Sequence, residues 1–202
     1  MPFVTAIEGF RRSGMPKAGE HVVIMGVNGK VGQAAAQLAT WQGAKVIGVV
    51  RKDEAYEGHA NAPIKVVNSA VTDVADRVHE LTGGKGADIV FNTVGDPYFD
   101  DAHHSLAKGG RQILITAVHN IVRFNILEFY RGRHTYVGID TLAFSSVESA
   151  EVLRSVLPGF AAGFLRPFPI KTSSIYSLSD AKAAYAAVIG SSRDRIVLRP
   201  GA

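Results

Sequence analysis

Short apolar runs alternate along this chain with longer segments of mixed polarity. The runs are rich in β-branched residues and continuous, which is typical of parallel strands buried on both faces. The segments between them space their apolar residues as a helix does. This alternation predicts an α/β fold, a doubly wound parallel six-stranded sheet with helices on both faces. The expected strands are His21–Gly26, Lys45–Val50, Ile64–Val67, Asp88–Phe91, Gln112–Thr116 and Thr135–Ile139.

Helical stripes and glycines mark the expected helices between these strands. One stripe follows the first strand, and a second precedes Gly83-Gly84. Gly83-Gly84 and Gly109-Gly110 are expected just past helices, where a left-handed residue ends the helix. A lead-in helix is expected at Val4–Arg12, ended by Gly14 and Pro16. The two stripes are Val31, Ala34, Ala35, Leu38 and Trp41, and Val71, Val74, Val78 and Leu81.

The alternation of strands and helices changes after the sixth expected strand. This change predicts two domains. Residues 1–165 are expected to form the sheet with its lead-in helix, and residues 166–202 a C-terminal segment that packs on something beyond the sheet. The expected elements after Ile139 are a helix at Val147–Leu157, a hinge-like Pro158-Gly159, a strand at Ile170–Ile175, a helix starting within Ser177–Asp180 and a strand at Arg195–Leu198.

Composition narrows the possible functions. Of the 202 residues, 47% are hydrophobic, which is enough for a core. The net charge of +4 suits an anionic ligand, but no run of Lys or Arg exceeds two, so no nucleic-acid partner is expected. Cysteine is absent, which excludes disulfides, a thiolate nucleophile and thiolate-bound zinc. With neither a membrane span nor a signal-peptide layout in the sequence, a cytoplasmic protein is expected.

The most informative motif is Gly26–Gly32, with the sequence GVNGKVG, between the first strand and the following helix. A helix N-terminus presents N–H groups and a positive dipole end, and glycines let a pyrophosphate and the strand come close. The spacing departs from the usual GxGxxG, because Val27 stands where the first glycine is expected. The motif predicts a nucleotide site formed by Gly26, Asn28, Gly29, Lys30, Val31 and Gly32.

The end of the second strand indicates which nucleotide is bound. Cofactors with a free ribose 2′-hydroxyl are usually held there by an acidic residue. Here the strand ends at Val50, and Arg51-Lys52 follow. A guanidinium binds a 2′-phosphate in bidentate geometry, so the sequence favours NADPH over NADH. The alternative is that Arg51 and Lys52 form a solvated turn.

Several segments together resemble the cofactor domain of the medium-chain dehydrogenase/reductase superfamily, in its zinc-independent quinone oxidoreductase and enoyl reductase branch. They occur in the family's order along nearly the whole chain, which is far more specific than one motif. The segments are Thr5-Ala6, Lys17–Ile24, Gly26–Gly32, Gln37–Ala39, Gly43–Ile47, Leu81–Gly95, Leu106–Arg111 and Arg195–Pro200.

The resemblance implies a Rossmann domain and further cofactor-binding residues. Residues after the fourth strand would line the adenosine and ribose, those after the fifth would lie near the pyrophosphate and nicotinamide, and those in the sixth would flank the nicotinamide. Ser69 stands where some members carry a Tyr near the 2′-phosphate. The implied residues are Thr93, Val94 and Gly95, then Thr116, Ala117 and Val118, then Val137 and Gly138.

The resemblance also implies the reaction and a missing part. Members carry an N-terminal catalytic domain that is not found in this sequence, and residues 166–202 resemble the return into it. The expected activity is hydride transfer from NADPH to an activated C=C bond or a quinone, a small-molecule substrate. No catalytic residue can be named, so the isolated chain is expected to bind cofactor with little activity. Zinc-dependent members carry a Cys near the position of Pro2, and its absence here predicts no zinc and no metal site.

Other interpretations stay open. The chain could be a non-catalytic nucleotide-binding or sensing module, or a subunit that needs a separate catalytic chain. A methyltransferase would also use a glycine loop, but it would need an acid at the strand end where Val50 stands. The family often dimerises through the edge of the sixth strand, so a homodimer is possible here.

Two groups of charged residues are candidates for further sites. Asp100, Asp101, His103 and His104 are potential metal ligands, but a solvated helix face is the expected role. Asp96 and Pro97 are expected as the N-cap and first residue of that helix. For Arg123, Arg131 and Arg133 the alternatives are a nucleic-acid surface and a solvated rim beside the cofactor cleft, and the rim is expected.

Overall fold

The computed structural model describes residues 1–190, 192 and 194–201, in two compact units, Met1–Leu165 and Arg166–Ala202. Residues 191, 193 and 202, which belong to the expected segment 166–202, lie outside the described residues. No helix in the described part of the chain is long and apolar enough to cross a membrane.

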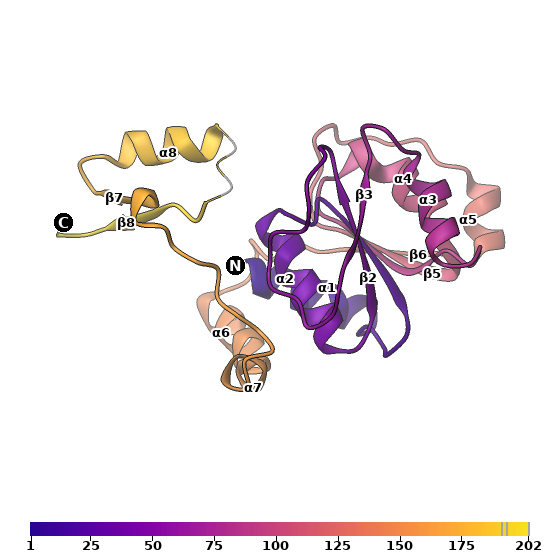
Figure 1. The fold of residues 1–202 in the computed structure, drawn as a ribbon, viewed down its shortest axis with the longest axis horizontal. Helices are drawn as coiled ribbons and strands as arrows, with labels where there is room; N and C mark the ends of the chain where they lie inside the picture. Colours follow the sequence, from indigo (N-terminus) through magenta and orange to yellow (C-terminus); the bar gives the residue numbers. More distant parts are fainter. Residues whose placement is uncertain (191, 193, 202) are drawn as a thin grey trace. The chain divides into compact units, whose positions relative to one another are not determined.

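The first unit is built on a parallel sheet whose strands lie in the order β3-β2-β1-β4-β5-β6 (Figure 1). This order confirms the predicted doubly wound fold. The direction in which successive strands are added reverses between β1 and β4, and sheets of this kind bind ligands at that point. The strands are β1 (His21–Met25), β2 (Lys45–Val50), β3 (Lys65–Asn68), β4 (Ala87–Asn92), β5 (Leu106–Leu114) and β6 (Thr135–Gly138).

Helices cover both faces of the sheet, as predicted (Figure 1). On one face α1 (Pro2–Ser13) packs against α2 (Lys30–Trp41), and α3 (Val74–Leu81) packs against α4 (Phe99–His104) on the other. The remaining helices of this unit are α5 (Ile126–Gly132), α6 (Ser146–Arg154) and α7 (Leu157–Ala161).

Alternate residues of the buried strands form two cores. Val23 and Met25 of β1 join a cluster with Val74 and Val78 of α3. On the other face the Phe10 ring meets the Phe91 ring edge to face, with centroids 5.2 Å apart. Both rings are fully buried, so this pair anchors α1 to the middle of the sheet.

Three local predictions were wrong. Val71 is 79% exposed and precedes α3, which begins at Val74 because the Asp73 carboxylate accepts from the N–H of Asp76. Gly109 and Gly110 lie within β5 and follow no helix, since the strand starts at Leu106 and its register against β4 shifts between Ala87 and Ile89. Pro158 lies in the first turn of α7, which begins at Leu157, instead of forming a hinge, because proline fits the first turn of a helix.

The second unit contains a parallel pair of strands, β7 (Ile175–Ser177) and β8 (Val197–Arg199), and the helix α8 (Ala181–Ile189). The strand predicted at Ile170–Ile175 is wrong. A short 3-10 turn, η2 (Thr172–Ser174), occupies that place, since Ser and Thr favour turns over regular structure. The following helix begins at Ala181, directly after the range Ser177–Asp180 in which its start was expected.

We predict that Phe10→Ala lowers the free energy of unfolding by about 3–5 kcal/mol, because it leaves a cavity against Phe91 that the sheet cannot close. Arg12→Ala, an exposed change on the same helix, is the control and should change stability by less than about 0.5 kcal/mol. Urea unfolding followed by circular dichroism measures both. Equal losses in the two variants would contradict the anchoring role.

Candidate cofactor site at the carboxyl end of the sheet

The loop after β1 is fastened to the end of β2. The N–H groups of Gly26 and Val27 both donate to the carbonyl of Val49, at 3.0 and 3.2 Å, and the N–H of Gly29 donates to the Gly26 carbonyl at 2.9 Å. Gly26 has a φ of 75°, which disfavours other residues. The loop is therefore a closed turn with a fixed position at the switch point.

Glycine is also required where α2 approaches β1. A Cβ on Gly32 would lie 2.4 Å from the Gly26 carbonyl oxygen and 2.8 Å from the Val27 Cα. Gly29 is the N-cap of α2, and no side chain of the described residues caps the helix there. The first turn of α2 thus offers its N–H groups and positive dipole end at the carboxyl end of the sheet, a cradle that fits a pyrophosphate.

Asn28 has a supporting role. Its side chain is buried, with 8% exposed, and its amide donates to the Ala55 carbonyl at 2.9 Å while its Oδ1 accepts from the Glu57 N–H at 3.0 Å. The side chain therefore holds the segment after β2 against the glycine loop. Arg51 and Lys52 lie exposed at the start of that segment, directly after β2 ends at Val50.

The end of β4 lies between the ends of its two neighbours. The Thr93 hydroxyl donates to the Met25 carbonyl at 2.6 Å. Gly95 has a φ of 94°, and a Cβ there would lie 2.8 Å from the carbonyl oxygen of Thr116. The structure thus brings Thr93 beside the glycine loop and Gly95 beside Thr116-Ala117.

Polar residues that the sequence analysis left unassigned shape this end of the sheet. The Asn92 Oδ1 accepts from the N–H groups of Val94 and Gly95, at 3.0 and 2.8 Å, although the side chain is fully buried. The Tyr98 hydroxyl lies 2.6 Å from the hydroxyl of Ser69 after β3. An amide at the end of a buried strand is the signal that could have identified Asn92.

Asp96 is not the N-cap that was predicted, because Gly95 holds that place before the 3-10 turn η1 (Asp96–Tyr98). Its carboxylate accepts from the backbone N–H groups of Val118 and His119 and from the His119 ring, whose Nδ1 lies at 2.8 Å. Desolvation would raise the pKa of Asp96, but these hydrogen bonds outweigh it and lower the pKa to about 2. Asp96 thereby fixes the segment that contains Val118.

The end of β6 also lies at the carboxyl end of the sheet. Val137 and Gly138 pair with Ile113 and Leu114 of β5. No described heavy atom lies within 4 Å of where a Cβ on Gly138 would be, so the backbone there is open. All the predicted cofactor-binding residues therefore follow or end strands at the carboxyl end of the sheet.

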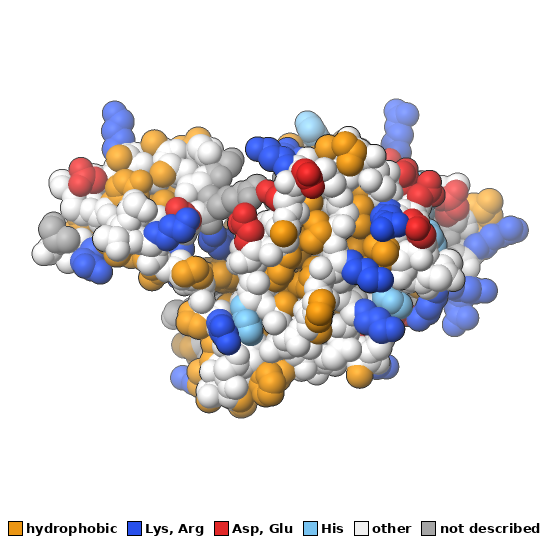
Figure 2. All heavy atoms as spheres, viewed as in Figure 1, with side chains coloured by type: hydrophobic (Ala, Val, Ile, Leu, Met, Phe, Trp, Pro, Cys, Tyr) orange, Lys and Arg blue, Asp and Glu red, His pale blue; other side chains and the backbone are white. Residues whose placement is uncertain are grey.

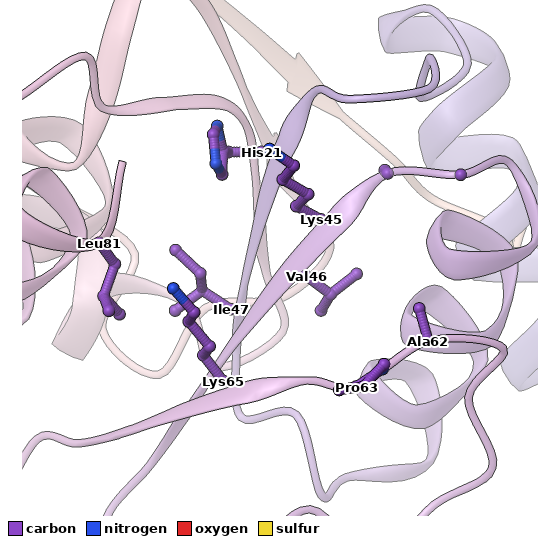
Figure 3. Close-up of a pocket in the computed structure, with 10 residues that line it drawn as sticks. His21, Lys45, Val46, Ile47, Ala62, Pro63, Lys65 and Leu81 are labelled. Atoms are coloured by element: carbon purple, nitrogen blue, oxygen red, sulfur yellow. The ribbon is translucent and has the colours of Figure 1, made fainter. Parts of the chain in front are cut away.

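A cavity of about 310 Å³ lies at the opposite end of the sheet (Figure 3). Its walls include His21, Lys45 and Lys65, which are the first residues of β1, β2 and β3. Burial lowers the pKa of His21, and the neighbouring Lys45 adds to that effect. Because the strands are parallel, this cavity is separate from the cofactor cradle.

His103 corrects the prediction of a solvated helix face, whereas Asp100 and His104 of α4 are exposed as predicted. His103 is only 4% exposed, and its Nδ1 lies 2.6 Å from the Tyr136 hydroxyl. Burial lowers the pKa of His103, and so does His104, against the opposing effect of Glu128. Arg123, Arg131 and Arg133 are exposed, and Figure 2 shows Lys and Arg side chains gathered where Figure 1 places α5.

Comparison with known proteins places this chain in a family. The family model described as zinc-binding dehydrogenase matches residues 31–156, from the start of α2 to beyond α6. The chain belongs to this family. It is a cofactor-binding domain of the medium-chain dehydrogenase/reductase superfamily, as its sequence resemblance implied.

Individual relatives agree with this assignment. A zinc-type alcohol dehydrogenase-like protein of Schizosaccharomyces pombe is 33% identical over 167 residues, covering 81% of this chain and 47% of the relative. Quinone oxidoreductase of Sus scrofa is 26% identical over 192 residues, covering 95% and 57%. The chain thus spans about half the length of these relatives. The fold matches Escherichia coli quinone oxidoreductase complexed with NADPH at a TM-score of 0.79 and 22% identity, covering 98% and 63%.

We predict that the Asp96 carboxyl titrates near pH 2 in the folded chain, below its ordinary range. Because the folded-state pKa is depressed, its stabilising effect is present above the unfolded pKa of about 3.9 and is lost as the pH falls through the folded value. Carboxyl-carbon NMR titration measures the pKa. An Asp96 pKa at or above the unfolded value would contradict the hydrogen bonds from Val118 and His119 to its carboxylate.

Proposed function

We propose that this domain binds NADPH at the carboxyl end of its sheet and supplies the cofactor half of an oxidoreductase that transfers hydride to an activated C=C bond or a quinone. The cradle formed by Gly26, Gly29 and Gly32 carries the proposal, because these glycines bring the start of α2 close to the strand end where a pyrophosphate binds. When bound, the cofactor supplies the hydride.

The charges at the end of β2 favour the phosphorylated cofactor. No acid stands at the strand end, and the exposed Arg51 and Lys52 follow it directly. We assign the 2′-phosphate to Arg51, with Lys52 as a second cation beside it. Ser69 lies near this place, with its hydroxyl 3.1 Å from the Val50 carbonyl and 2.6 Å from the Tyr98 hydroxyl.

The other residues position the cofactor and exclude water. In this proposal Thr93, Val94 and Gly95 line the ribose, while Thr116, Ala117 and Val118 border the pyrophosphate and nicotinamide. Val137 and Gly138 flank the ring. The hydrogen bonds of Asn92 and Asp96 fix the backbone of these segments before any cofactor binds. Less conformational entropy is therefore lost on binding.

The substrate is proposed from the relatives, since quinone oxidoreductase is among the names that match. The chain covers about half of such proteins, so we expect it to bind cofactor and to reduce substrate poorly alone. We propose that the protein is located in the cytoplasm. A nucleotide-sensing module is the alternative, and it too would bind NADPH but would gain no reductase activity from any catalytic partner.

We predict that calorimetry detects binding of NADPH, weaker binding of NADH and none of S-adenosylmethionine. Arg51→Ala should weaken NADPH binding by about tenfold to a hundredfold, since a hydrogen bond to a charged group is worth about 1.5–3 kcal/mol, and leave NADH unchanged. Lys45→Ala, at the other end of the sheet, is the matched control. Absence of nicotinamide binding would overturn the function, and an unchanged preference would overturn the role of Arg51.

We also propose a homodimer through the edge of β6, which is the last strand of the sheet order. An unpaired strand edge invites pairing with a second copy. Sedimentation velocity should give a dimer, and Thr135→Lys, which places an exposed charge on that edge, should shift it toward monomer. A monomer at every concentration would contradict this arrangement.

A further inference from the structure

Three side chains from two helices meet outside the cofactor site. His103 and His104 end α4, and Glu128 lies in the first turn of α5. The Glu128 Oε2 lies 3.5 Å from the His103 Nε2 and 3.4 Å from the His104 Nε2. One ligand atom from each residue lies within 4.8 Å of the other two. We call these residues the His103–His104–Glu128 cluster.

The distances from the Glu128 Oε2 to the two histidine nitrogens match those between two ligands of one metal ion. Nitrogen and oxygen ligands at about 2.0–2.2 Å from Zn²⁺, placed tetrahedrally, lie roughly 3.3–3.5 Å from one another. The same separations exceed the usual N–H···O distance of about 2.7–3.2 Å. The cluster is therefore spaced for an ion between its atoms better than for direct hydrogen bonds. The ligand atoms of His103 and His104 lie within 4.8 Å of each other.

Neighbouring groups orient two of the ligands toward that point. The Tyr136 hydroxyl contacts the His103 Nδ1 at 2.6 Å, which leaves Nε2 directed at Glu128. The Asn125 amide donates to the Glu128 Oε1 at 2.9 Å, which leaves Oε2 for the histidines. An outer partner on the second nitrogen of a histidine is the usual companion of a metal ligand.

We propose that the His103–His104–Glu128 cluster binds a divalent transition-metal ion of the zinc class and thereby fastens α5 to α4. Two imidazoles and a carboxylate suit zinc, and a fourth position stays open to water. The site has no cysteine and lies on α4 and α5, so it differs from the zinc site of zinc-dependent family members, whose Cys ligand would stand near Pro2. It is also independent of the proposed NADPH binding.

The first test uses the full 202-residue chain, stripped with a chelator and then titrated with Zn²⁺ by calorimetry. We expect one equivalent to bind and the temperature of unfolding to rise with Zn²⁺ concentration. Co²⁺ should give the visible absorption band of a tetrahedral site. No saturable binding, or no Co²⁺ band, would overturn the proposal.

Variants separate this site from general surface binding. Glu128→Gln and His104→Gln should each weaken Zn²⁺ binding by at least about tenfold, and Tyr136→Phe by about ten- to hundredfold, the range for loss of an orienting partner. Glu151→Gln, an exposed glutamate on α6, is the matched control and should bind Zn²⁺ as the parent chain does. Circular dichroism checks that each variant folds. Equal affinity in Glu128→Gln and the parent chain would overturn the assignment.

Discussion

The close approach of α2 to the end of β1 is the constraint on which the rest of the sheet unit depends. It is possible because Gly32 has no Cβ to meet the Gly26 carbonyl. It sets the path of the crossover to β2, where Gly48 in turn leaves room for the Val27 side chain. A side chain at either position would force the helix and strand layers apart, and the anion cradle would open with them.

Hydrogen bonds from side chains to the backbone then fix the neighbouring strand ends. Asn28, Asn92 and Asp96 each bind main-chain groups of an irregular segment, and Thr93 binds the carbonyl of Met25 at the end of β1. Irregular backbone at a partly buried edge needs such partners, because unpaired N–H and carbonyl groups are costly there. The apolar core thus places the strands, while these polar residues define the shape of the loops that would meet a ligand.

The sequence predicted the sheet well because buried parallel strands and glycine turns leave strong local patterns. It failed where a contact over a long separation decides the structure. His103 looks like part of a polar helix face, yet Tyr136, 33 residues away, buries it. Asp96 looks like a cap, yet it binds the backbone at His119. Gly109-Gly110 look like a helix end, yet they lie within β5, between its pairs with Ala87 and Ile89 of β4.

The part of the sheet unit around α5 is held by different forces from its core. None of the seven residues of α5, all of them described, is buried, and Ile121, Ile126 and Leu127 are 85%, 69% and 47% exposed. Burial of apolar surface therefore stabilises this helix little. Its fixed points are one half-buried ring and two polar groups: the Phe129 ring lies 5.0 Å from the Tyr136 ring, Asn125 accepts from the N–H of Leu127, and Glu128 reaches the histidines of α4. Because so few side chains hold this helix, charge or ligation at Glu128 affects α5 more than the same change would affect a strand of the core.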